Sequence, residues 1–507
     1  MTITVYEGTK KHELPFNEGE TILTVLQNAG IQSITAPCGG KGACKKCIVN
    51  AHVGEEGGPV LSCTTPAKDG MVVEFYPEDR FSFADRFAGR VFPPDAGLKG
   101  YGIACDIGTT KVVCQLVSLE SGELVCAVSG SNNQRIFGGD VLSRLVAAEE
   151  GHADEIHEQI ILQINEFIGQ LCRQADITSG DIRILAAAGN TIMMHFFAGL
   201  NPAQISTAPF TPVSLFGEMK KSRELGLAFD GDVYLCPSVS GFIGSDVLCG
   251  ILTGSMAEGE DSMMLIDLGA NTEMVMGNRD GMIACTVDGG AALKGSLLDH
   301  GMIAGLGAVS GARYRDGELI LDVLGAGKPT GICGSGFIDI LGILYEQEIL
   351  DEMGRIAAAD ETDSPLASHI GEEEGRTVFY VTKDKKIYIS QADISKFQMA
   401  KAAIYAGIRV LSEETGIPVS RISRLLLSGG MGSFVHRKNA ALLGMIPQEC
   451  MDNSVKLGNT ALAGAVSAVL SEKARAGLSR IQGMVKVIDL PTHPSFSDEF
   501  TDGMIFE

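Results

Sequence analysis

Four of the thirteen cysteines lie within the first 63 residues, and their spacing suits a site that binds metal through thiolates. Five residues separate Cys38 from Cys44, two separate Cys44 from Cys47, and fifteen separate Cys47 from Cys63. The other nine cysteines are scattered singly. The sequence starts without the pattern of an export signal, so we expect its thiols to stay reduced. Metal binding then explains the group of four better than disulfides do.

The segment PCGGKGACKKC resembles the cluster-binding loop of a 2Fe-2S ferredoxin. Its three glycines, Gly39, Gly40 and Gly42, let a loop turn backbone amides toward the cluster sulfurs. A tetrahedral zinc site is the alternative, because four cysteines with one two-residue gap also suit zinc. Zinc ribbons usually pair two short knuckles, whereas one glycine-rich loop carries three ligands here. This difference favours a 2Fe-2S cluster.

The residues around this loop predict the elements of a small ferredoxin-like domain. The patterns in ITVYEG and HELPFNEG indicate a hairpin, ETILTVLQNAG indicates a short helix that ends at Gly30, and MVVEFYP indicates a closing strand. We therefore expect an α+β domain of the β-grasp ferredoxin type over residues 1–77.

A tether is predicted between this domain and the rest of the chain, at residues 78–99. The segment mixes charged and aromatic residues with a Pro-Pro pair and has no sustained period, which is typical of a linker. In the alternative, its phenylalanines dock on a neighbouring domain: Phe81, Phe83, Phe87 and Phe92.

A turn after the tether could bind phosphate. The segment GIACDIGTTKVVCQLVSL predicts two strands joined by a turn with Asp106, Gly108, Thr109 and Thr110. Glycine lets the backbone approach an anion, the hydroxyls and amides donate hydrogen bonds, and the aspartate can hold a hydrated magnesium ion. One such turn by itself is more simply a glycine turn after a strand.

Two further glycine turns follow in the chain. In MMLIDLGANTEMVMG the first pattern recurs between two apolar strands, with the polar and glycine positions Asp267, Gly269, Asn271 and Thr272. In RLLLSGGMGSF three glycines follow an apolar strand, where a base and ribose could lie against bare backbone: Gly429, Gly430 and Gly432. Three turns in this order predict a clamp around a nucleotide.

Together these pieces resemble the superfamily of acetate and sugar kinases, heat-shock chaperones and actin, over residues 100–480. The resemblance implies a two-lobed actin-like ATPase with ribonuclease H-like lobes, so the fold class of the whole chain is multidomain α/β. The implied division is lobe I from 100–257 with 456–480, lobe II from 258–455, and a C-terminal tail, 481–507.

The resemblance also implies a role for each residue of the turns. Asp106 and Asp267 are the implied catalytic carboxylates, and Asp267 would orient the attacking water. The other implied nucleotide contacts are Gly108, Thr109, Thr110, Gly269, Asn271, Thr272, Gly429, Gly430 and Gly432. The turn of Gly334, Ser335 and Gly336 before an apolar helix either cradles phosphate or caps that helix, and both alternatives stay open.

Longer phrases narrow the resemblance to one family. GICGSGFIDILGILYEQEILDEMGR, DISKFQMAKAAIYAGIRVL and LGNTALAGAVSAVL, together with the cysteine loop, are similar to the ATP-dependent reductive activators of corrinoid proteins. The resemblance implies that one electron passes from a low-potential donor, such as ferredoxin, flavodoxin or a flavoprotein, through a 2Fe-2S cluster to Co(II). The Co(I) produced accepts methyl groups, as in O-demethylation. ATP and Mg²⁺ are the other implied cofactors, and a homodimer is a further expectation.

The composition argues against two classes of partner, nucleic acids and membranes. Lys+Arg number 40 against 63 Asp+Glu, which gives a net charge of −23, so a polyanion would be repelled and we expect no nucleic-acid partner. No window of about 18 apolar residues occurs, so we expect no membrane partner and a cytoplasmic location.

Three other functions remain as alternatives. A small-molecule kinase would share the clamp but has no use for an iron-sulfur loop. An activator of a 2-hydroxyacyl-CoA dehydratase or benzoyl-CoA reductase resembles a bare nucleotide domain. A non-catalytic electron carrier would bind ATP without turning it over.

Several residues outside the turns have simpler explanations. His195 lies in an apolar run and is predicted to be a hydrogen-bonded core histidine. Asp140 follows Gly139, Asp246 follows Gly244 and Ser245, and each precedes an apolar helical pattern, so both are predicted as helix N-caps. Six of the later cysteines lie in apolar strand-like or helical contexts and are predicted to act as small hydrophobic residues: Cys105, Cys114, Cys126, Cys236, Cys249 and Cys285.

Overall fold

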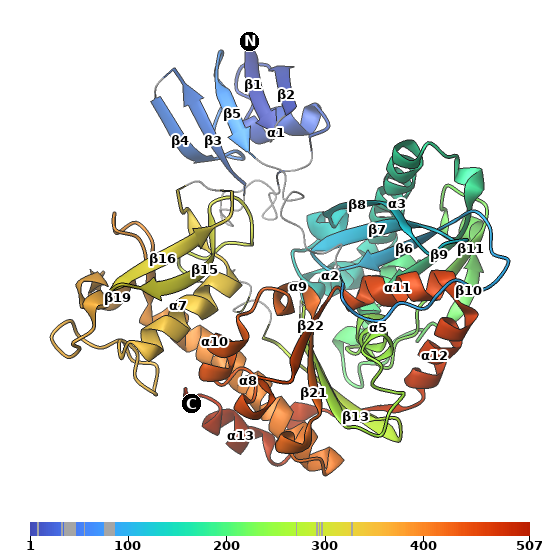
Figure 1. Cartoon of the computed structure of the whole chain (residues 1–507). Helices are drawn as coiled ribbons and strands as arrows, with labels where there is room; N and C mark the ends of the chain where they lie inside the picture. Colours follow the sequence, from blue (N-terminus) through green and yellow to red (C-terminus); the bar gives the residue numbers. More distant parts are fainter. Residues whose placement is uncertain are drawn as a thin grey trace.

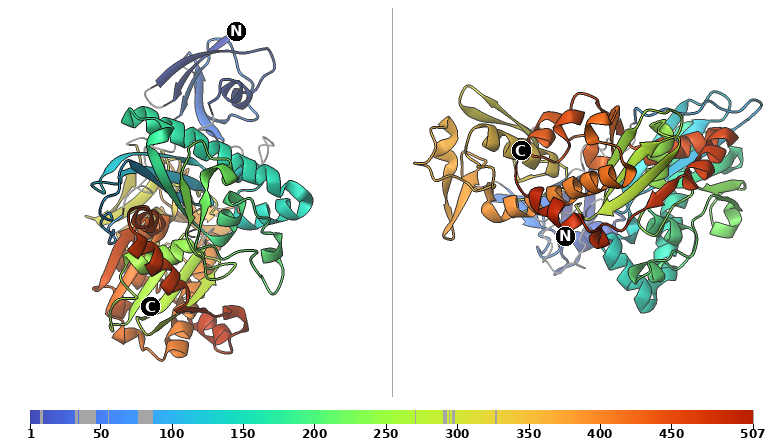
Figure 2. Two further views of the ribbon diagram at one scale, coloured as in Figure 1. Left: turned by 90° about the vertical axis from the view of Figure 1, so that its right-hand side faces the viewer. Right: turned by 90° about the horizontal axis from the view of Figure 1, so that it is seen from below.

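The structure is a computed structural model of the whole chain (Figure 1). It describes residues 1–7, 10–31, 34, 47–54, 56–75, 87–269, 271–289, 293, 295, 298–325 and 328–506. A small N-terminal domain stands apart from two larger lobes, and the side view in Figure 2 shows the same separation. We call the part built on the sheet of β6–β11 lobe I, and the part built on the sheet of β12–β14 and β21–β23 lobe II.

The N-terminal domain is a five-stranded sheet with strand order β2-β1-β5-β3-β4, packed against one helix. β1 pairs with β5 in parallel, and its other neighbour β2 is antiparallel. The element bounds are β1 Thr2–Glu7, β2 Lys10–Pro15, α1 Ile22–Asn28, β3 Ile48–Val53, β4 Glu56–Leu61 and β5 Val72–Phe75. The predicted hairpin, helix and closing strand of a ferredoxin-like domain are all confirmed.

Helix α1 forms where the sequence supplies a cap and an apolar face. The Thr21 hydroxyl accepts a hydrogen bond from the Thr24 amide at 3.2 Å, which satisfies one of the unpaired amides of the first turn. Ile22, Val25 and Leu26 are buried against the sheet. The helix ends before Gly30, which has a φ of +73°.

Residues 87–99 of the predicted tether are packed on both lobes. Phe92 is buried in a core to which both lobes contribute, and its amide donates to the Ser467 hydroxyl of lobe I. Phe87 forms an antiparallel bridge with Gly458, and the Ala88 amide donates to the Leu457 carbonyl at 2.8 Å. Docking of the phenylalanines therefore holds for Phe87 and Phe92, whereas Phe81 and Phe83 lie outside the described residues.

Lobe I is a six-stranded sheet with the order β10-β11-β9-β6-β7-β8. β6, β7 and β8 form an antiparallel meander, and β9 lies parallel to β6. The strands are β6 Tyr101–Ile107, β7 Lys111–Ser118, β8 Leu124–Ser131, β9 Ile182–Ala188, β10 Glu218–Lys221 and β11 Asp232–Leu235. The helices are α2 Val141–Ala147, α3 Ala153–Ala175, α4 Thr191–Phe197, α5 Ser245–Thr253, α11 Thr460–Leu470 and α12 Glu472–Gln482.

Lobe II has a second six-stranded sheet, with the order β22-β21-β12-β13-β14-β23. Its strands are β12 Met263–Leu268, β13 Thr272–Asn278, β14 Gly281–Val287, β21 Arg424–Ser428, β22 Ser454–Gly458 and β23 Val485–Val487. Its helices are α7 Gly334–Glu346, α8 Gln391–Thr415, α9 Gly429–Gly432, α10 Arg437–Leu442 and α13 Phe496–Asp502. Two small sheets complete it: β15 Ala308–Arg315, β16 Glu318–Val323 and β17 Gly331–Ile332; β18 Ile370–Glu373, β19 Arg376–Tyr380 and β20 Tyr388–Ser390.

The two large sheets repeat one topology. The order β11-β9-β6-β7-β8 in lobe I corresponds to β22-β21-β12-β13-β14 in lobe II, each with an antiparallel meander beside parallel strands. The predicted pair of related lobes is therefore confirmed. Because the β6–β7 and β12–β13 turns hold equivalent places in these sheets, the repeated sequence pattern has a structural counterpart.

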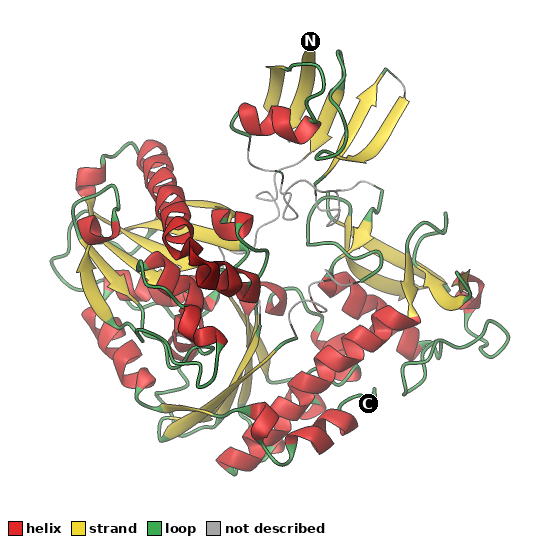
Figure 3. Ribbon diagram, turned by 180° about the vertical axis from the view of Figure 1, so that it is seen from behind, coloured by secondary structure: helices red, strands yellow, loops and turns green. Residues whose placement is uncertain are grey.

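The residues predicted as a tail, 481–507, carry β23 and α13. β23 pairs in parallel with β14, and α13 packs against α8 near the C-terminus (Figure 3). Phe506 is buried, and its amide donates to the Glu352 carbonyl. The end of the described chain thus belongs to the core of lobe II.

Among the described residues, none of the helices combines the length and apolar character needed to cross a bilayer.

Candidate functional site

The first predicted phosphate turn joins β6 to β7 and is tightly closed. Asp106 is the second-last residue of β6 and lies opposite Ala188 of β9. A Cβ on Gly108 would lie only 2.7 Å from the Lys111 carbonyl oxygen, so this position excludes larger residues. Thr109 is buried, and its hydroxyl accepts a hydrogen bond from the side-chain Nδ2 of Asn190 at 3.0 Å. Thr110 is exposed.

The second turn joins β12 to β13 in lobe II. Asp267 is the second-last residue of β12, as Asp106 is of β6. The Gly269 amide donates to the Asn271 carbonyl at 3.0 Å and closes the turn. Thr272 is buried at the start of β13.

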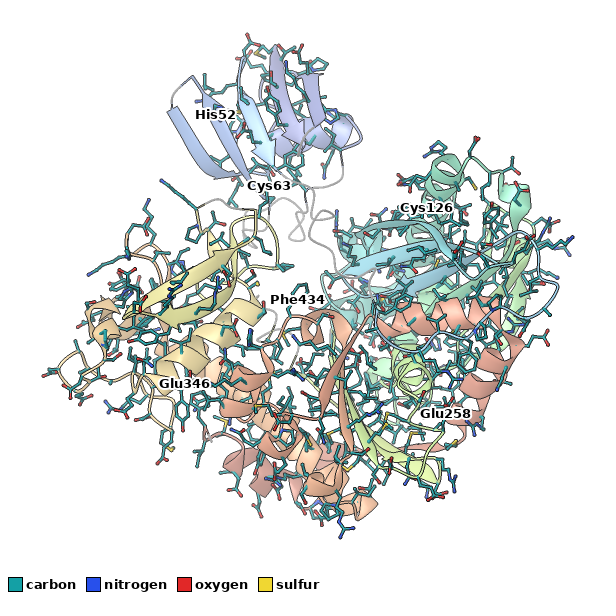
Figure 4. The ribbon with its side chains drawn as sticks, in the orientation of Figure 1. His52, Cys63, Cys126, Glu258, Glu346 and Phe434 are labelled. Carbon is teal, nitrogen blue, oxygen red and sulfur yellow. The ribbon has the colours of Figure 1, made fainter. Side chains whose placement is uncertain are left out.

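The third glycine segment touches the second turn directly. Asp267 lies opposite Ser428 of β21, whose hydroxyl donates to Asp267 Oδ2 at 2.6 Å. The next residue, Gly429, has a φ of +82°, and a Cβ there would lie 2.6 Å from Asp267 Oδ1. Gly430 and Gly432 follow in the short helix α9. Figure 4 shows Phe434, just after α9, between the two lobes.

Asn459 connects the two lobes at the first turn. It follows β22 of lobe II and caps α11, where its side-chain oxygen accepts from the Leu462 amide at 2.9 Å. Its Nδ2 donates to Asp106 Oδ2 at 2.7 Å. The pKa of Asp106 is raised to about 7, because burial and the charge of Asp267 raise it by more than the hydrogen bond from Asn459 lowers it. Asp106, Asp267 and Asn459 thus form one electrostatic unit.

Asp246 is a third carboxylate of this unit, and its predicted role as an N-cap is wrong. The N-cap of α5 is Gly244, and Asp246 is the second residue of the helix. Burial, together with the charges of Asp267 and Asp106, raises the pKa of Asp246 to about 7. Asp140, by contrast, is the N-cap of α2 as predicted, and its carboxylate accepts from the Ser143 amide at 2.7 Å.

Sequence reasoning missed Asp246 and Asn459 because each has a sequence context that a helix start explains. Both precede apolar helical runs, and Asn459 does cap its helix. The signal in Asn459 was its place in the phrase LGNTALAGAVSAVL, which is one of the phrases that carry the family resemblance. Nothing local distinguishes Asp246, whose proximity to Asp106 and Asp267 arises only from tertiary packing.

Gly334, Ser335 and Gly336 form the first turn of α7 and are buried. The N-cap is Cys333, and the Ser335 hydroxyl donates to the Ser310 carbonyl at 2.7 Å. A Cβ on Gly336 would lie 2.1 Å from the Val309 carbonyl oxygen, so glycine allows α7 to pack on β15. Packing on β15 accounts for this turn, and its phosphate role stays a prediction.

His195 is a core histidine, as predicted. It is fully buried, with Nδ1 2.7 Å from the Thr191 carbonyl oxygen, and Nε2 accepts from the amides of Val213 and Ser214. Burial lowers its pKa, which favours this neutral form. Among the later cysteines, Cys126 is partly exposed, and the following are buried: Cys105, Cys114, Cys172, Cys236, Cys249, Cys285, Cys333 and Cys450.

Two of the four predicted cluster ligands lie side by side in the N-terminal domain. Cys47 and Cys63 are both buried and pack in one small group with Leu23. The Ser62 amide donates to the Cys47 carbonyl at 2.8 Å, which fixes the two segments together. Figure 4 shows Cys63 at the end of the domain that faces the lobes. Cys38 and Cys44 lie outside the described residues.

The donor set of this region fits a 2Fe-2S cluster. Iron-sulfur clusters are held by cysteine thiolates, and Cys47 and Cys63 approach each other in a water-poor setting from two different segments. In the nucleotide region, Gly108 and Gly429 leave backbone open where any Cβ would collide. Such bare backbone beside carboxylates suits a phosphate chain with a hydrated divalent cation.

Models of known domain families match three successive segments of the chain. The "2Fe-2S iron-sulfur cluster binding domain" matches residues 11–76, the "RACo middle region" matches 101–259, and the "C-terminal domain of RACo the ASKHA domain" matches 261–507. The boundary between the last two falls between α5 and β12.

Two proteins and one solved structure are similar over most of their length. The "Corrinoid activation enzyme RamQ" of Eubacterium limosum is 28% identical, with 98% of each chain covered. The "[Co(II) methylated amine-specific corrinoid protein] reductase" of Methanosarcina barkeri is 26% identical over 74% of this chain and 71% of its own. The solved structure is a "Reductive activator for corrinoid,iron-sulfur protein", with 27% identity, a TM-score of 0.70, and 99% and 98% of the two chains covered. With its ferredoxin domain, its paired lobes and these matches, the chain belongs to the family of ATP-dependent reductive activators of corrinoid proteins.

Proposed function

We propose that this protein uses ATP to reduce the Co(II) form of a corrinoid protein to Co(I), the state that accepts methyl groups. The main support for this proposal is that Asp106 and Asp267, from equivalent strands of two related lobes, meet at one site together with Gly429. A ferredoxin domain on the same chain supports electron transfer as the process that the nucleotide drives. The similarity to a corrinoid activation enzyme supports a corrinoid protein as the acceptor.

The residues of the N-terminal domain would hold the electron carrier. Cys38, Cys44, Cys47 and Cys63 would ligate a 2Fe-2S cluster, which when bound supplies a one-electron relay. A tenfold change in a one-electron equilibrium corresponds to 59 mV, or about 1.4 kcal/mol. Reduction of a cobalt couple more negative than the donor therefore needs another source of free energy, which ATP can provide.

The residues between the lobes would bind and turn over the nucleotide. Backbone amides of the turn at Gly108 would approach the phosphates, and the segment at Gly429 would take the adenosine side. Asp106 and Asp267 would hold hydrated Mg²⁺, and Asp267 would orient the attacking water. Carboxylates next to a polyphosphate repel it unless a cation lies between them, so we infer that nucleotide binds together with Mg²⁺.

Asp246 adds a third carboxylate to this proposed site. It is coupled electrostatically to both Asp106 and Asp267, so it must respond to any cation that they bind. We assign it to the water shell of that cation or to the attacking water. ATP would act by favouring the closed arrangement of the lobes and the complex in which cobalt is easier to reduce, because a ligand shifts an equilibrium only through differential affinity.

Other parts of the proposal concern partners and location. We infer that the electron comes from a low-potential ferredoxin, flavodoxin or flavoprotein, that two copies of the chain form a homodimer, and that the protein acts in the cytoplasm. The corrinoid acceptor would belong to a methyltransferase system, such as one for O-demethylation.

The test is a reduction assay without oxygen. The purified protein is mixed with a Co(II) corrinoid protein and a Ti(III) reductant, with MgATP or with a non-hydrolysable analogue, and the visible spectrum is followed. We expect Co(I) to form only with MgATP and with an intact ferredoxin domain. If ATP hydrolysis proceeds equally with and without the corrinoid protein and no Co(I) appears, the proposal is wrong.

A further inference from the structure

The main-chain carbonyls of Gly108, Thr109 and Thr110, in the first phosphate turn, each accept a hydrogen bond from a residue that the nucleotide would not touch. Asn132 Nδ2 donates to the Gly108 carbonyl at 2.9 Å, and the Asn132 amide donates to the Thr110 carbonyl at 2.9 Å. Between them, a terminal nitrogen of Arg144 donates to the Thr109 carbonyl at 2.6 Å. Asn132 and Arg144 are both fully buried.

These three hydrogen bonds fix the orientation of the peptide groups in the turn. In a trans peptide, the carbonyl of one residue and the amide of the next point to opposite sides. Because the Gly108 and Thr109 carbonyls point toward Asn132 and Arg144, the amides of Thr109 and Thr110 point away from them. Successive amides on one side of a turn form an anion-binding nest. The buried residues thus prepare the turn for phosphate.

Arg144 is held in place by neutral partners. Its Nε donates to the Gly138 carbonyl at 3.0 Å, and a terminal nitrogen lies 3.4 Å from Gln134 Oε1 and 3.0 Å from Met193 Sδ. Among the described residues Arg144 forms no salt bridge, although the charge of Asp140, at the start of the same helix, acts on it. Burial lowers its pKa to about 10, so the guanidinium still carries its charge at neutral pH.

A buried charge is costly; the charge of Asp140 offsets part of that cost for Arg144, and a bound anion would reduce it further. Helix α2, which carries Arg144, is fixed at its start by reciprocal hydrogen bonds between Asp140 and Ser143. The planar fork of arginine can reach several acceptors in fixed directions, which lysine cannot do. This geometry explains why a guanidinium, rather than an ammonium, lies behind the turn.

We propose that Arg144, together with Asn132, is a positioning residue of the nucleotide site, which holds the turn at Thr109 ready for phosphate and supplies a buried positive charge for the polyphosphate. The proposal rests on the proposed function, because it takes the turn at Gly108–Thr110 to be a phosphate site. Arg144 acts through the backbone of Thr109 and does not itself touch the nucleotide.

The alternative is that Arg144 only stabilises lobe I, and Lys401 provides the matched control. Lys401 is also fully buried, and its ammonium also donates to a main-chain carbonyl, that of Ile505, but in lobe II. Lys401→Met should lower the melting temperature without changing nucleotide affinity. An effect specific to phosphate is therefore separable from a loss of stability.

The experiment measures the dissociation constants of MgATP and adenosine by calorimetry for the full-length wild-type protein, Arg144→Gln, Arg144→Lys, Asn132→Ala and Lys401→Met. The ratio of adenosine to MgATP constants reports on the phosphates alone. We expect this ratio to fall at least tenfold in Arg144→Gln and about threefold in Arg144→Lys and Asn132→Ala, and to stay unchanged in Lys401→Met. If Arg144→Gln does not fold, the two milder variants decide the matter.

An unchanged ratio in the folded Arg144 and Asn132 variants would overturn the proposal, even if their melting temperatures fell. Such a result with normal ATP-dependent corrinoid reduction by the wild type would leave the proposed function intact. A wild-type protein that binds MgATP but reduces no corrinoid protein would contradict the proposed function, while the ratios would still test Arg144.

Discussion

Asp106 and Asp246 are carboxylates whose protonation changes near neutral pH. The pKa of each is raised to about 7, chiefly by burial, and the charge of Asp267 contributes to both increases. A raised carboxyl pKa means that the folded protein binds more protons than the unfolded chain between about pH 4 and 7. The free energy of unfolding therefore falls as pH rises through this window.

We predict that Asp246→Asn stabilises the nucleotide-free protein, and more so at pH 8 than at pH 5. The amide removes the cost of a buried negative charge that the wild type must carry at high pH. Melting temperatures measured across this range check the prediction, with the exposed Asp230→Asn on lobe I as the control. Equal shifts at pH 5 and pH 8 would contradict it.

At the residue scale, the sequence identified site residues where both the type of side chain and the predicted local structure pointed to a binding turn. Asp106 and Asp267 could be selected because each ends a strand before a glycine turn, and the structure brings the two together. Asp246 could not be selected, because a carboxylate at the start of an apolar helical pattern looks like a cap. The predicted ligands Cys47 and Cys63 meet in one buried group, although fifteen residues separate them in the chain.

At the scale of elements, the turn from β21 into α9 depends on glycine at one position. Gly429 has a positive φ and lies against Asp267, whereas a Cβ on Gly430 would meet nothing within 4 Å. A side chain at Gly429 would be strained by about 1–3 kcal/mol and would displace the Asp267 carboxylate.

We predict that Gly429→Ala weakens MgATP binding at least tenfold and lowers the melting temperature, while Gly430→Ala changes neither by a comparable amount. Calorimetric titration and thermal unfolding of the two variants check this. Equal effects of the two substitutions would show that contact with Asp267 is not what requires glycine here.

A second prediction at this scale concerns the junction of β22 and α11. Asn459→Ala removes both the cap of α11 and the donor to Asp106, and we expect it to cost about 1 kcal/mol from the cap alone. Asn459→Asp keeps an acceptor for the Leu462 amide but places a negative charge against Asp106, which should raise the pKa of Asp106 further.

For Asn459→Asp we therefore expect near-normal stability and ATP hydrolysis that is reduced about tenfold at pH 7 and recovers at higher pH. Rates of ATP hydrolysis measured from pH 6 to 9 provide the check. A pH profile identical to that of the wild type would mean that Asn459 does not control Asp106.

Secondary-structure elements could be predicted from the sequence where the same residue pattern occurs twice. The repeated turn indicated two related lobes, and the two sheets have equivalent strand orders. The docking of residues 87–99 was left open, because a segment without periodicity can be flexible or packed, and only the burial of Phe92 decides between these. The role of β23 and α13 in lobe II was missed, because a three-residue strand leaves almost no pattern.

At the scale of the whole molecule, the ferredoxin domain and the nucleotide lobes have separate cores. We predict that Cys63→Ser abolishes corrinoid reduction while MgATP affinity stays within about twofold of the wild-type value. The visible spectrum of the reconstituted protein, the rate of Co(I) formation and a nucleotide titration check this together. Cys450→Ser, a buried cysteine in lobe II, is the control and should leave reduction intact. Loss of nucleotide affinity in Cys63→Ser would show that the two parts depend on each other.

The bridge between Phe87 and Gly458 limits how far the ferredoxin domain can lie from the nucleotide lobes. Strand β5 ends at Phe75, so eleven residues, 76–86, lie between the ferredoxin sheet and that anchor. An extended chain spans at most about 3.6 Å per residue, so the end of β5 lies within roughly 40 Å of Phe87. Reductant and cobalt must both reach the ferredoxin domain within this distance of Phe87. Gly458, which pairs with Phe87, directly precedes Asn459, so the anchor of the ferredoxin domain and the hydrogen bond to Asp106 are neighbours in the chain.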